Sequence, residues 1–320
     1  MSKKQDTEQY IFNLVYKDKQ NLKIIHKDKP DFWITNAKHR FGVEITEIYK
    51  NESAARLSNI PNYTGELLDL EKYRHKDDYE ALIVDDIEII RENGDKKKTK
   101  AVIQSVPSIR EFSIRFTACI ENKNKLSSGY NNELSYYNLI VYDRINSLSS
   151  VSVDDFFNVF FTKEIINILV KVNFKEIFLI TSLSNKKFYF PLKRILLVSR
   201  IYLFQEMINK IYKEETEIPD EIYYRWLGEY LCFEGFNDVY LFAKNGNFEL
   251  NFSNIGYVIG PNNQVQIRLY DTHVLDYSNY EKITTKKYFT PENQTLIRNI
   301  EQTFGFSCGL GIELKNNNNT

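Results

Sequence analysis

The sequence predicts an α/β protein in which helices flank a mixed sheet, followed by a C-terminal unit of α+β type. Residues 31–49 hold two alternating apolar runs joined by a short polar turn, a pattern typical of a hairpin. Apolar strand patterns at 136–143 and from Glu176 alternate with helical periodicity. From residue 192 the pattern changes to mostly helical and then to short strands, which indicates a second unit.

Composition is that of a folded protein with a sizeable core. The chain has 320 residues, 42% of them hydrophobic and 27% charged, and a net charge of −1. Contacts with nucleic acid must therefore come from local basic patches. Three cysteines without a CxxC pattern argue against a zinc ribbon or a disulfide framework. The N-terminus lacks an apolar signal region and no run approaches 18 apolar residues, so we expect a cytoplasmic protein that does not contact a membrane.

The elements follow from periodicity and turn chemistry. Apolar residues at helical spacing predict helices, β-rich runs beside Asn-Gly predict hairpins, and apolar runs of seven or eight residues predict buried strands. In chain order the predicted elements are a helix at 7–17, a hairpin at 31–49, a polar and partly helical stretch at 51–80, a hairpin at 87–104, a helix at 108–130, a strand at 136–143, a helix at 154–172, a strand from 176, helices within 192–235 and short strands within 236–275. A boundary near 200 then divides the chain into residues 1–200, with an insert at about 51–107, and residues 201–320.

Two acids in the first hairpin indicate a metal site. Along the strand 41–49, side chains alternate, so that Glu44 points the same way as Thr46 and Ile48. A tight turn brings Asp31, at the start of the neighbouring strand, close to Glu44. Two adjacent carboxylates repel each other unless a cation lies between them. Oxygen ligands on rigid strands suit Mg²⁺ or Mn²⁺, which can activate water and stabilise charge on a phosphate.

At these residues the chain resembles the PD-(D/E)xK nuclease superfamily, which has the restriction-endonuclease-like fold. The resemblance covers a core from the helix at 7 to the strand near 142. It implies that Asp31 of "PDF" and Glu44 of "EIT" bind the metal. Thr46 departs from the family pattern, because it stands where the lysine of ExK is expected. In parts of the superfamily the helix that follows supplies this lysine.

Lys123 is the lysine that the helix at 108–130 would supply. It lies on the same helical stripe as Phe116 and Ile120, which should face the sheet, whereas Lys125 is rotated by about 200°. A lysine on an apolar stripe needs a polar partner, and a carboxylate cluster would provide one. An ordinary lysine that extends its ammonium to solvent remains the alternative. On the first helix, Glu8 shares the inward stripe, and the resemblance makes it a further metal ligand or an orienting group; a surface or capping role is the alternative.

Basic residues near the hairpins are candidates for contact with nucleic acid. Turn and hairpin-tip lysines are usually solvated, but they can also bind a phosphate backbone. These candidates are Lys38, His39, Arg40, Lys96, Lys97 and Lys98.

Two other motifs compete with this site. Pro219-Asp220 opens a helical pattern, and Gly311–Lys315 reads as a literal ExK without a Pro-Asp strand before it.

The resemblance implies a Mg²⁺-dependent or Mn²⁺-dependent endonuclease that hydrolyses phosphodiester bonds, with DNA favoured over RNA and a role in restriction or antiviral defence. A second copy of the chain or a partner protein of a defence system would be its protein partner. The alternative is a non-catalytic module that keeps the nuclease fold to bind nucleic acid or a partner protein, since the ExK lysine is missing. Within residues 201–320 no motif identifies a role.

Overall fold

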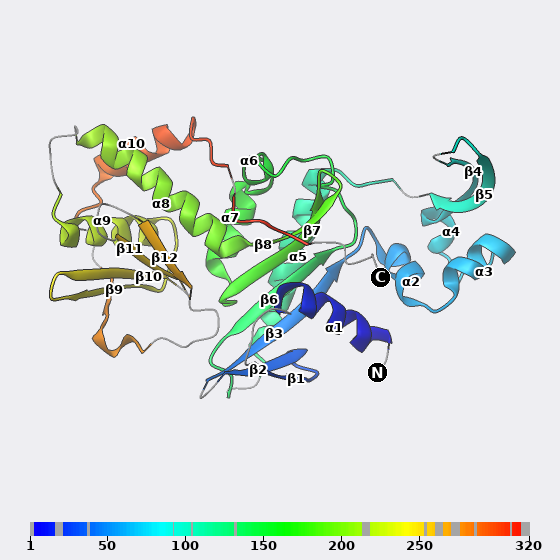
Figure 1. Ribbon diagram of the computed structural model, residues 1–320, viewed down its shortest axis with the longest axis horizontal. Helices are drawn as coiled ribbons and strands as arrows, with labels where there is room; N and C mark the ends of the chain where they lie inside the picture. The colour runs from blue at the N-terminus through cyan, green and yellow to red at the C-terminus, as the bar shows by residue number, and fades with distance from the viewer. Residues whose placement is uncertain are drawn as a thin grey trace.

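The protein consists of two sheets joined by a long helix, with a small insert at one end (Figure 1). The computed structural model describes residues 3–16, 22–36, 39–91, 93–103, 105–130, 133–212, 218–252, 255–259, 265–269, 276–284, 287–307 and 309–314. This mixed α/β architecture agrees with the predicted class. None of the helices in these residues is both long enough and apolar enough to cross a membrane.

The larger sheet is mixed and has seven strands in the order β1-β2-β3-β6-β7-β8-β14. Its centre is the parallel trio β3, β6 and β7, and all other neighbouring strands are antiparallel. The strands are β1 (Lys23–His26), β2 (Phe32–Asn36), β3 (His39–Ile48), β6 (Tyr137–Asp143), β7 (Glu176–Leu183), β8 (Lys186–Pro191) and β14 (Ile312–Glu313). The predicted hairpin at 31–49 and the strands at 136–143 and from 176 are confirmed. Strand β1 was not predicted, and β14 at the edge of the sheet carries Glu313 of the competing motif Gly311–Lys315, whose Lys315 lies outside the described residues.

Helices cover both faces of this sheet. On one face, α1 (Lys3–Tyr16) packs Phe12 against residues such as Val43 and Ile45. On the other face lie α5 (Ile109–Ser127), α6 (Phe156–Phe160) and α7 (Lys163–Lys171), which pack against a larger apolar cluster that includes Ile48 and Val141. The alternation predicted for β3 is therefore correct, because Val43 and Ile45 face α1 while Ile48 faces the side of α5.

Helix α5 begins at a reciprocal cap. The Ser108 hydroxyl accepts from the Glu111 backbone N–H (3.2 Å), and the Glu111 carboxylate accepts from the Ser108 backbone N–H (2.8 Å). This cap starts the helix near the predicted residue. Its inward stripe, with Phe112, Phe116 and Ile120 fully buried, sets the rotation of the helix over the sheet.

The prediction of one helix at 154–172 is wrong, since the chain forms α6 and α7 with a break between them. Phe160 and Phe161 are both buried although a continuous helix would point them about 100° apart. The break between the two helices allows both phenylalanine rings to be buried. Thr162 then caps α7, with its hydroxyl accepting from the Ile165 backbone N–H.

A second, antiparallel sheet follows, with five strands in the order β12-β11-β10-β9-β13. Its strands are β9 (Val239–Lys244), β10 (Asn247–Phe252), β11 (Ile255–Ile259), β12 (Val265–Leu269) and β13 (Glu281–Lys282), and the helices beside it are α8 (Leu192–Ile211), α9 (Asp220–Phe233) and α10 (Pro291–Glu301). Pro219-Asp220 starts α9, as the helical pattern predicted.

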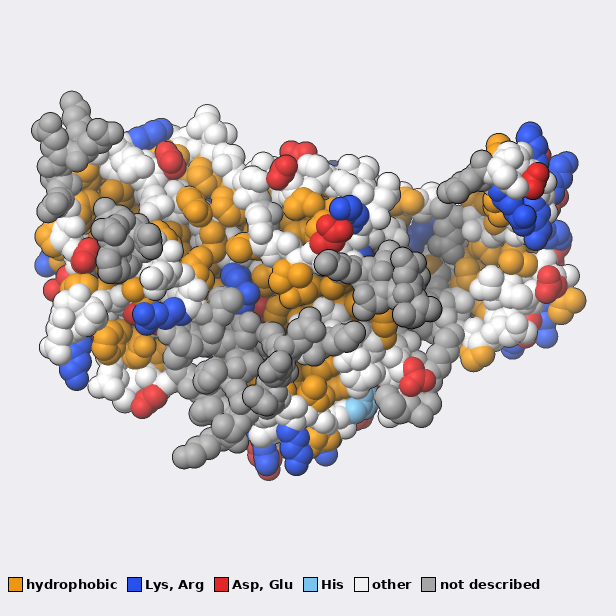
Figure 2. Space-filling view, viewed as in Figure 1, with side chains coloured by type: hydrophobic (Ala, Val, Ile, Leu, Met, Phe, Trp, Pro, Cys, Tyr) orange, Lys and Arg blue, Asp and Glu red, His pale blue; other side chains and the backbone are white. Residues whose placement is uncertain are grey.

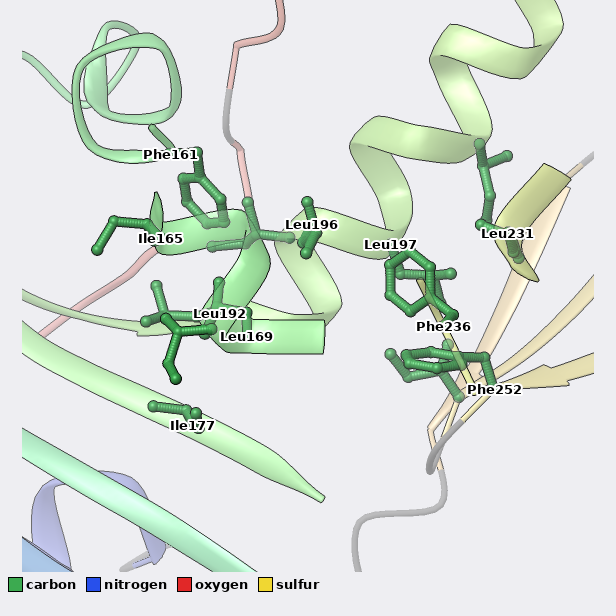
Figure 3. Close-up of a cluster of buried hydrophobic side chains, with 14 of the residues drawn as sticks. Phe161, Ile165, Leu169, Ile177, Leu192, Leu196, Leu197, Leu231, Phe236 and Phe252 are labelled. Atoms are coloured by element: carbon green, nitrogen blue, oxygen red, sulfur yellow. The ribbon is translucent and has the colours of Figure 1, made fainter. Parts of the chain in front are cut away.

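The predicted boundary near 200 lies inside α8. A continuous apolar cluster runs from Ile177 of β7, through Leu196 and Leu197 of α8, to Phe252 of β10 (Figure 3). Strand β14, from the C-terminal part of the chain, also pairs with β8 of the first sheet. Helix α8 is thus shared by both sheets.

The predicted insert follows β3 and precedes α5 in the chain, and it forms a separate small unit at one end of the molecule (Figure 1). It consists of α2 (Glu52–Asn59), α3 (Tyr63–Leu70), α4 (Asp78–Ala81) and the hairpin β4 (Ile83–Ile90) and β5 (Lys96–Ile103). Its own core is small, with Tyr63, Leu67 and Leu82 fully buried. The fully buried Asp78 joins its helices, because it pairs with Arg56 of α2 (2.6 Å) and accepts from the Tyr63 hydroxyl of α3 (2.6 Å). Although burial opposes ionisation, hydrogen bonds from Arg56 and Tyr63 lower the pKa of Asp78 to about 2.

We predict that Asp78→Ala destabilises the insert by about 3 kcal/mol, because it leaves a partly buried arginine without its main acid partner. Hydrogen exchange of the amides within 52–103 should become faster than in the wild type. Asp77→Ala, which removes the exposed neighbouring acid, is the matched control and should leave exchange unchanged. Equal protection in both variants would contradict the anchoring role of Asp78.

Candidate metal and phosphate site

Asp31 is held at the entry to β2 by packing of the preceding proline. The Pro30 ring lies against Gly42 of β3, where an added Cβ would approach the ring to 2.4 Å, so only glycine fits at position 42. The Asp31 carbonyl accepts from the Lys27 backbone N–H (2.7 Å), which closes the turn from β1. The carboxylate is buried, and its Oδ2 accepts from the Ile45 backbone N–H at 2.7 Å.

Glu44 lies on the adjacent strand and on the same side as Asp31. Phe32 pairs with Val43, and one further step in this antiparallel register places Asp31 opposite Glu44. Directly opposed residues share a face of the sheet, so the hairpin brings the two acids together as expected. Glu44 is 7% exposed and points toward α5.

The Lys123 ammonium reaches Glu44 from α5. Its Nζ lies 2.5 Å from Glu44 Oε1. One helical turn earlier, the Cys119 thiol contacts the Thr46 hydroxyl (3.4 Å), so α5 crosses directly over this part of β3. Lys123 therefore lies beside Glu44, where the sequence predicted it, and Lys125 is exposed on the other side of the helix.

Asp31 is the acid of the Asp31 and Glu44 pair whose pKa is strongly raised. Burial, followed by the negative charge of Glu44, raises the pKa of Asp31 from 3.8 to about 7. The Ile45 N–H and Lys123 favour the ionised form but do not outweigh these two effects. Asp31 therefore takes up a proton near neutral pH unless a further positive charge is supplied.

Tyr130 was not predicted as a site residue; it is the last residue of the predicted helix 108–130 and lies beyond the end of α5. Its hydroxyl is buried beside Glu44, and burial followed by the Glu44 charge raises the pKa of the phenol. Neither the Tyr130 hydroxyl nor Glu44 Oε2 completes a hydrogen bond of regular geometry with any described residue, and both atoms are buried. Glu44 thus has one oxygen on Lys123, and the Tyr130 hydroxyl lies beside the same carboxylate.

Glu8 approaches the site from α1, on the other face of the sheet. Its charge contributes to the raised pKa of Asp31. However, Glu8 Oε2 lies 2.9 Å from His26 Nε2, and its Oε1 lies 3.3 Å from Lys4 Nζ. The orienting role suits this arrangement better than the ligand role. Sequence patterns gave no signal for His26, because its strand β1 is short and mostly exposed.

A third buried acid of the sheet shows what a structural carboxylate looks like. Asp143 accepts from the Thr181 hydroxyl (2.7 Å) and from the backbone N–H groups of Ile145 (2.7 Å) and Asn146 (3.1 Å). These bonds use both oxygens. Asp31 and Glu44 have fewer partners, which distinguishes them from an acid that serves only the fold.

The donor set suits a hard divalent cation. Two buried carboxylates occupy opposed positions on neighbouring strands, and burial and the Glu44 charge raise the pKa of Asp31. Asp31 and Glu44 are the residues that would hold Mg²⁺ or Mn²⁺. Within the described ranges, no three or more His, Cys, Asp or Glu side chains are grouped as for a metal ion. Water and phosphate oxygens would have to complete the coordination.

The predicted nucleic-acid contacts lie in two places. Arg40 of β3 pairs with Glu133 (3.2 Å); Lys38 and the side chain of His39 lie outside the described residues. The second group lies on the hairpin of the insert, where lysines gather on the surface (Figure 2). There Lys96 pairs with Glu88 (3.0 Å), while Lys97 and Lys98 are exposed and form no ion pair with a described residue.

Comparisons of the chain with protein-family models, with curated proteins and with solved structures gave no match.

We predict that Asp31→Asn stabilises the metal-free protein at pH 8 but not at pH 4. The pKa of Asp31 is about 7 in the folded state and lies above its ordinary value of 3.8. Ionisation of Asp31 therefore destabilises the fold progressively as the pH rises from 3.8 to about 7, and the full destabilisation is present above pH 7. Asparagine keeps an acceptor for the Ile45 N–H and removes the charge. Thermal unfolding in EDTA at both pH values measures the effect.

Asp28→Asn is the control for this measurement, because Asp28 is an exposed acid of the same turn. The assignment of strain to Asp31 fails if the change in Tm for Asp31→Asn is the same at pH 4 and pH 8.

Proposed function

We propose that the chain is a metal-dependent nuclease of the PD-(D/E)xK type, in which Asp31 and Glu44 bind the cation and Lys123 replaces the lysine of ExK. The position of Lys123 carries this proposal. Its ammonium lies 2.5 Å from Glu44, although Thr46 stands at the usual lysine position.

The order of the elements supports the restriction-endonuclease-like fold. Helix α1 is followed by the antiparallel meander β1-β2-β3, then by α5, and then by β6, which is parallel to β3. The resemblance covers the helix, the hairpin at 31–49, the following helix and the strand near 142, and β1 adds a strand to this order. The insert between β3 and α5 leaves the pairing of β3 with β6 intact.

The side chains divide the chemical tasks. A bound Mg²⁺ or Mn²⁺ would activate a water molecule and stabilise charge on the scissile phosphate. Asp31 and Glu44 supply the oxygen ligands, and the Ile45 N–H fixes the Asp31 carboxylate. Lys123 orients Glu44 and offers an ammonium to the water or the phosphate, because an ammonium has three donors and Glu44 takes one. Glu8, held by His26, keeps a negative charge behind Asp31.

DNA is the substrate that we propose, with RNA as the alternative. The lysine-rich hairpin β4–β5 would contact a phosphate backbone, and the salt dependence of binding would then reflect Lys97 and Lys98. The resemblance also implies a cytoplasmic role in restriction or antiviral defence, alone or with a partner protein.

A non-catalytic module is the second candidate. The closed pair between Lys123 and Glu44 favours it, since a salt bridge of this kind can stabilise the fold without any metal. The two functions differ in their response to cations. Mg²⁺ or Mn²⁺ should raise the Tm of a nuclease and leave that of an inert module unchanged.

We predict that Asp31→Ala and Glu44→Ala each reduce Mg²⁺-dependent cleavage to background, because each removes a ligand of the cation. Cleavage is measured on plasmid, single-stranded DNA and RNA. Glu47→Ala is the matched control, since Glu47 lies on the same strand but points to the other face and pairs with Arg144. Full activity in either of the first two variants would refute the site.

We predict that Lys123→Ala removes most of the activity but keeps binding of Mn²⁺, because both acids remain. Lys125→Ala should have little effect, since Lys125 is exposed. Cleavage assays and Mn²⁺ titration separate the two readouts. Equal activity of the Lys123→Ala variant and the wild type would favour the non-catalytic module.

A further inference from the structure

A second polar cleft lies where α7, α8, α9 and α10 meet. Its volume is about 800 Å³, within the range of small-molecule sites. The residues that line it come from the outer side of α7, from Arg200 of α8, from the end of α9 and from α10. None of them belongs to the Asp31 and Glu44 site.

One wall of the cleft is a closed ring of two arginines and two glutamates. Arg200 contacts Glu234 (3.0 Å) and Glu301 (2.7 Å). Arg298 contacts the same two acids, at 3.2 Å and 2.8 Å. The charges of this wall cancel, and the buried Arg200 and Glu234 make it rigid.

The ring leaves one flat cationic group facing outward. The Arg298 guanidinium lies 4.9 Å from the centre of the Phe233 ring, and the arginine side chain is 48% exposed. The guanidinium carbon therefore lies over the aromatic ring. The other face can stack on a planar group of a ligand.

The opposite wall is positively charged. Lys163, Asn167 and Lys171 follow one another at four-residue spacing on α7, so they lie on one face of that helix. All three are exposed, and the two lysines form no ion pair with any described residue. Because the ring is neutral, these lysines give the cleft a net positive charge.

The end of α9 closes the cleft against α7. Gly235 has a φ of +96°, and an added Cβ would lie 3.2 Å from Val170 of α7. A glycine is needed for this close approach with left-handed backbone. The two walls are thus fixed relative to each other by direct packing.

We infer that this cleft binds a phosphorylated small molecule of nucleotide size. The phosphates contact Lys163 and Lys171, with the Asn167 amide beside them, and the planar base stacks on Arg298. This site is independent of the proposed nuclease chemistry, because it shares no residue with it.

Isothermal titration of the full chain with ATP and GTP, in EDTA, tests the inference, since EDTA removes any cation from the carboxylate site. At least one nucleotide should bind the wild type, and the double variant Lys163→Gln, Lys171→Gln should raise its Kd at least about tenfold, which is about 1.4 kcal/mol. The double variant Lys125→Gln, Lys210→Gln removes two exposed lysines elsewhere and should leave the Kd unchanged.

Inorganic tripolyphosphate, which lacks a base, should bind more weakly than the nucleotide. No binding of ATP or GTP in the millimolar range would overturn the inference, as would an equal loss of affinity in both double variants. Equal affinities for tripolyphosphate and the nucleotide would overturn the role of Arg298.

Discussion

In the antiparallel pair β2–β3, Phe32 lies opposite Val43, and this register decides which side chains gather beneath α5. A shift of one residue would turn Glu44 toward α1 and bring Val43 to the polar side. The register is protected by the apolar residues of the same strands, because Phe32, Val43 and Ile45 are buried against α1. Packing on one face of the sheet thereby fixes the chemistry on the other face.

The ionised form of Asp31 opposes folding, whereas the apolar core favours it. Lys123 compensates the charge of Glu44. Among the described residues Asp31 accepts a hydrogen bond only from the Ile45 backbone N–H, and burial makes its ionised form unfavourable. A fold retains such a pair at a cost in stability. Burial also raises the pKa of Asp143, but three hydrogen bonds to its two oxygens oppose this effect, whereas Asp31 has one such bond from a described residue.

Much of the first sheet could be predicted because its strands and helices carry clear periodicity. The stripe of Phe116 and Ile120 located Lys123, and alternation along β3 located Glu44. Other features depend on contacts between distant residues. His26 lies on a short, exposed strand, and Tyr130 has a role only because its loop folds back toward Glu44. The break before Thr162 was missed because two adjacent phenylalanines in an apolar run read as helix. The cleft beside Arg200 joins four helices, and local patterns do not reveal such a meeting point.

The position of helix α8 determines how the two sheets respond to unfolding or truncation of the chain. Its 20 residues span about 30 Å, and its buried side chains, from Leu192 to Met207, include apolar members of the cluster that the two sheets share. Unwinding of the buried part of α8 would expose apolar side chains that pack in this shared cluster. Loss of the C-terminal sheet would therefore destabilise the first sheet. We expect the two sheets to unfold cooperatively on heating. A chain cut near residue 200 should lose the fold of both parts.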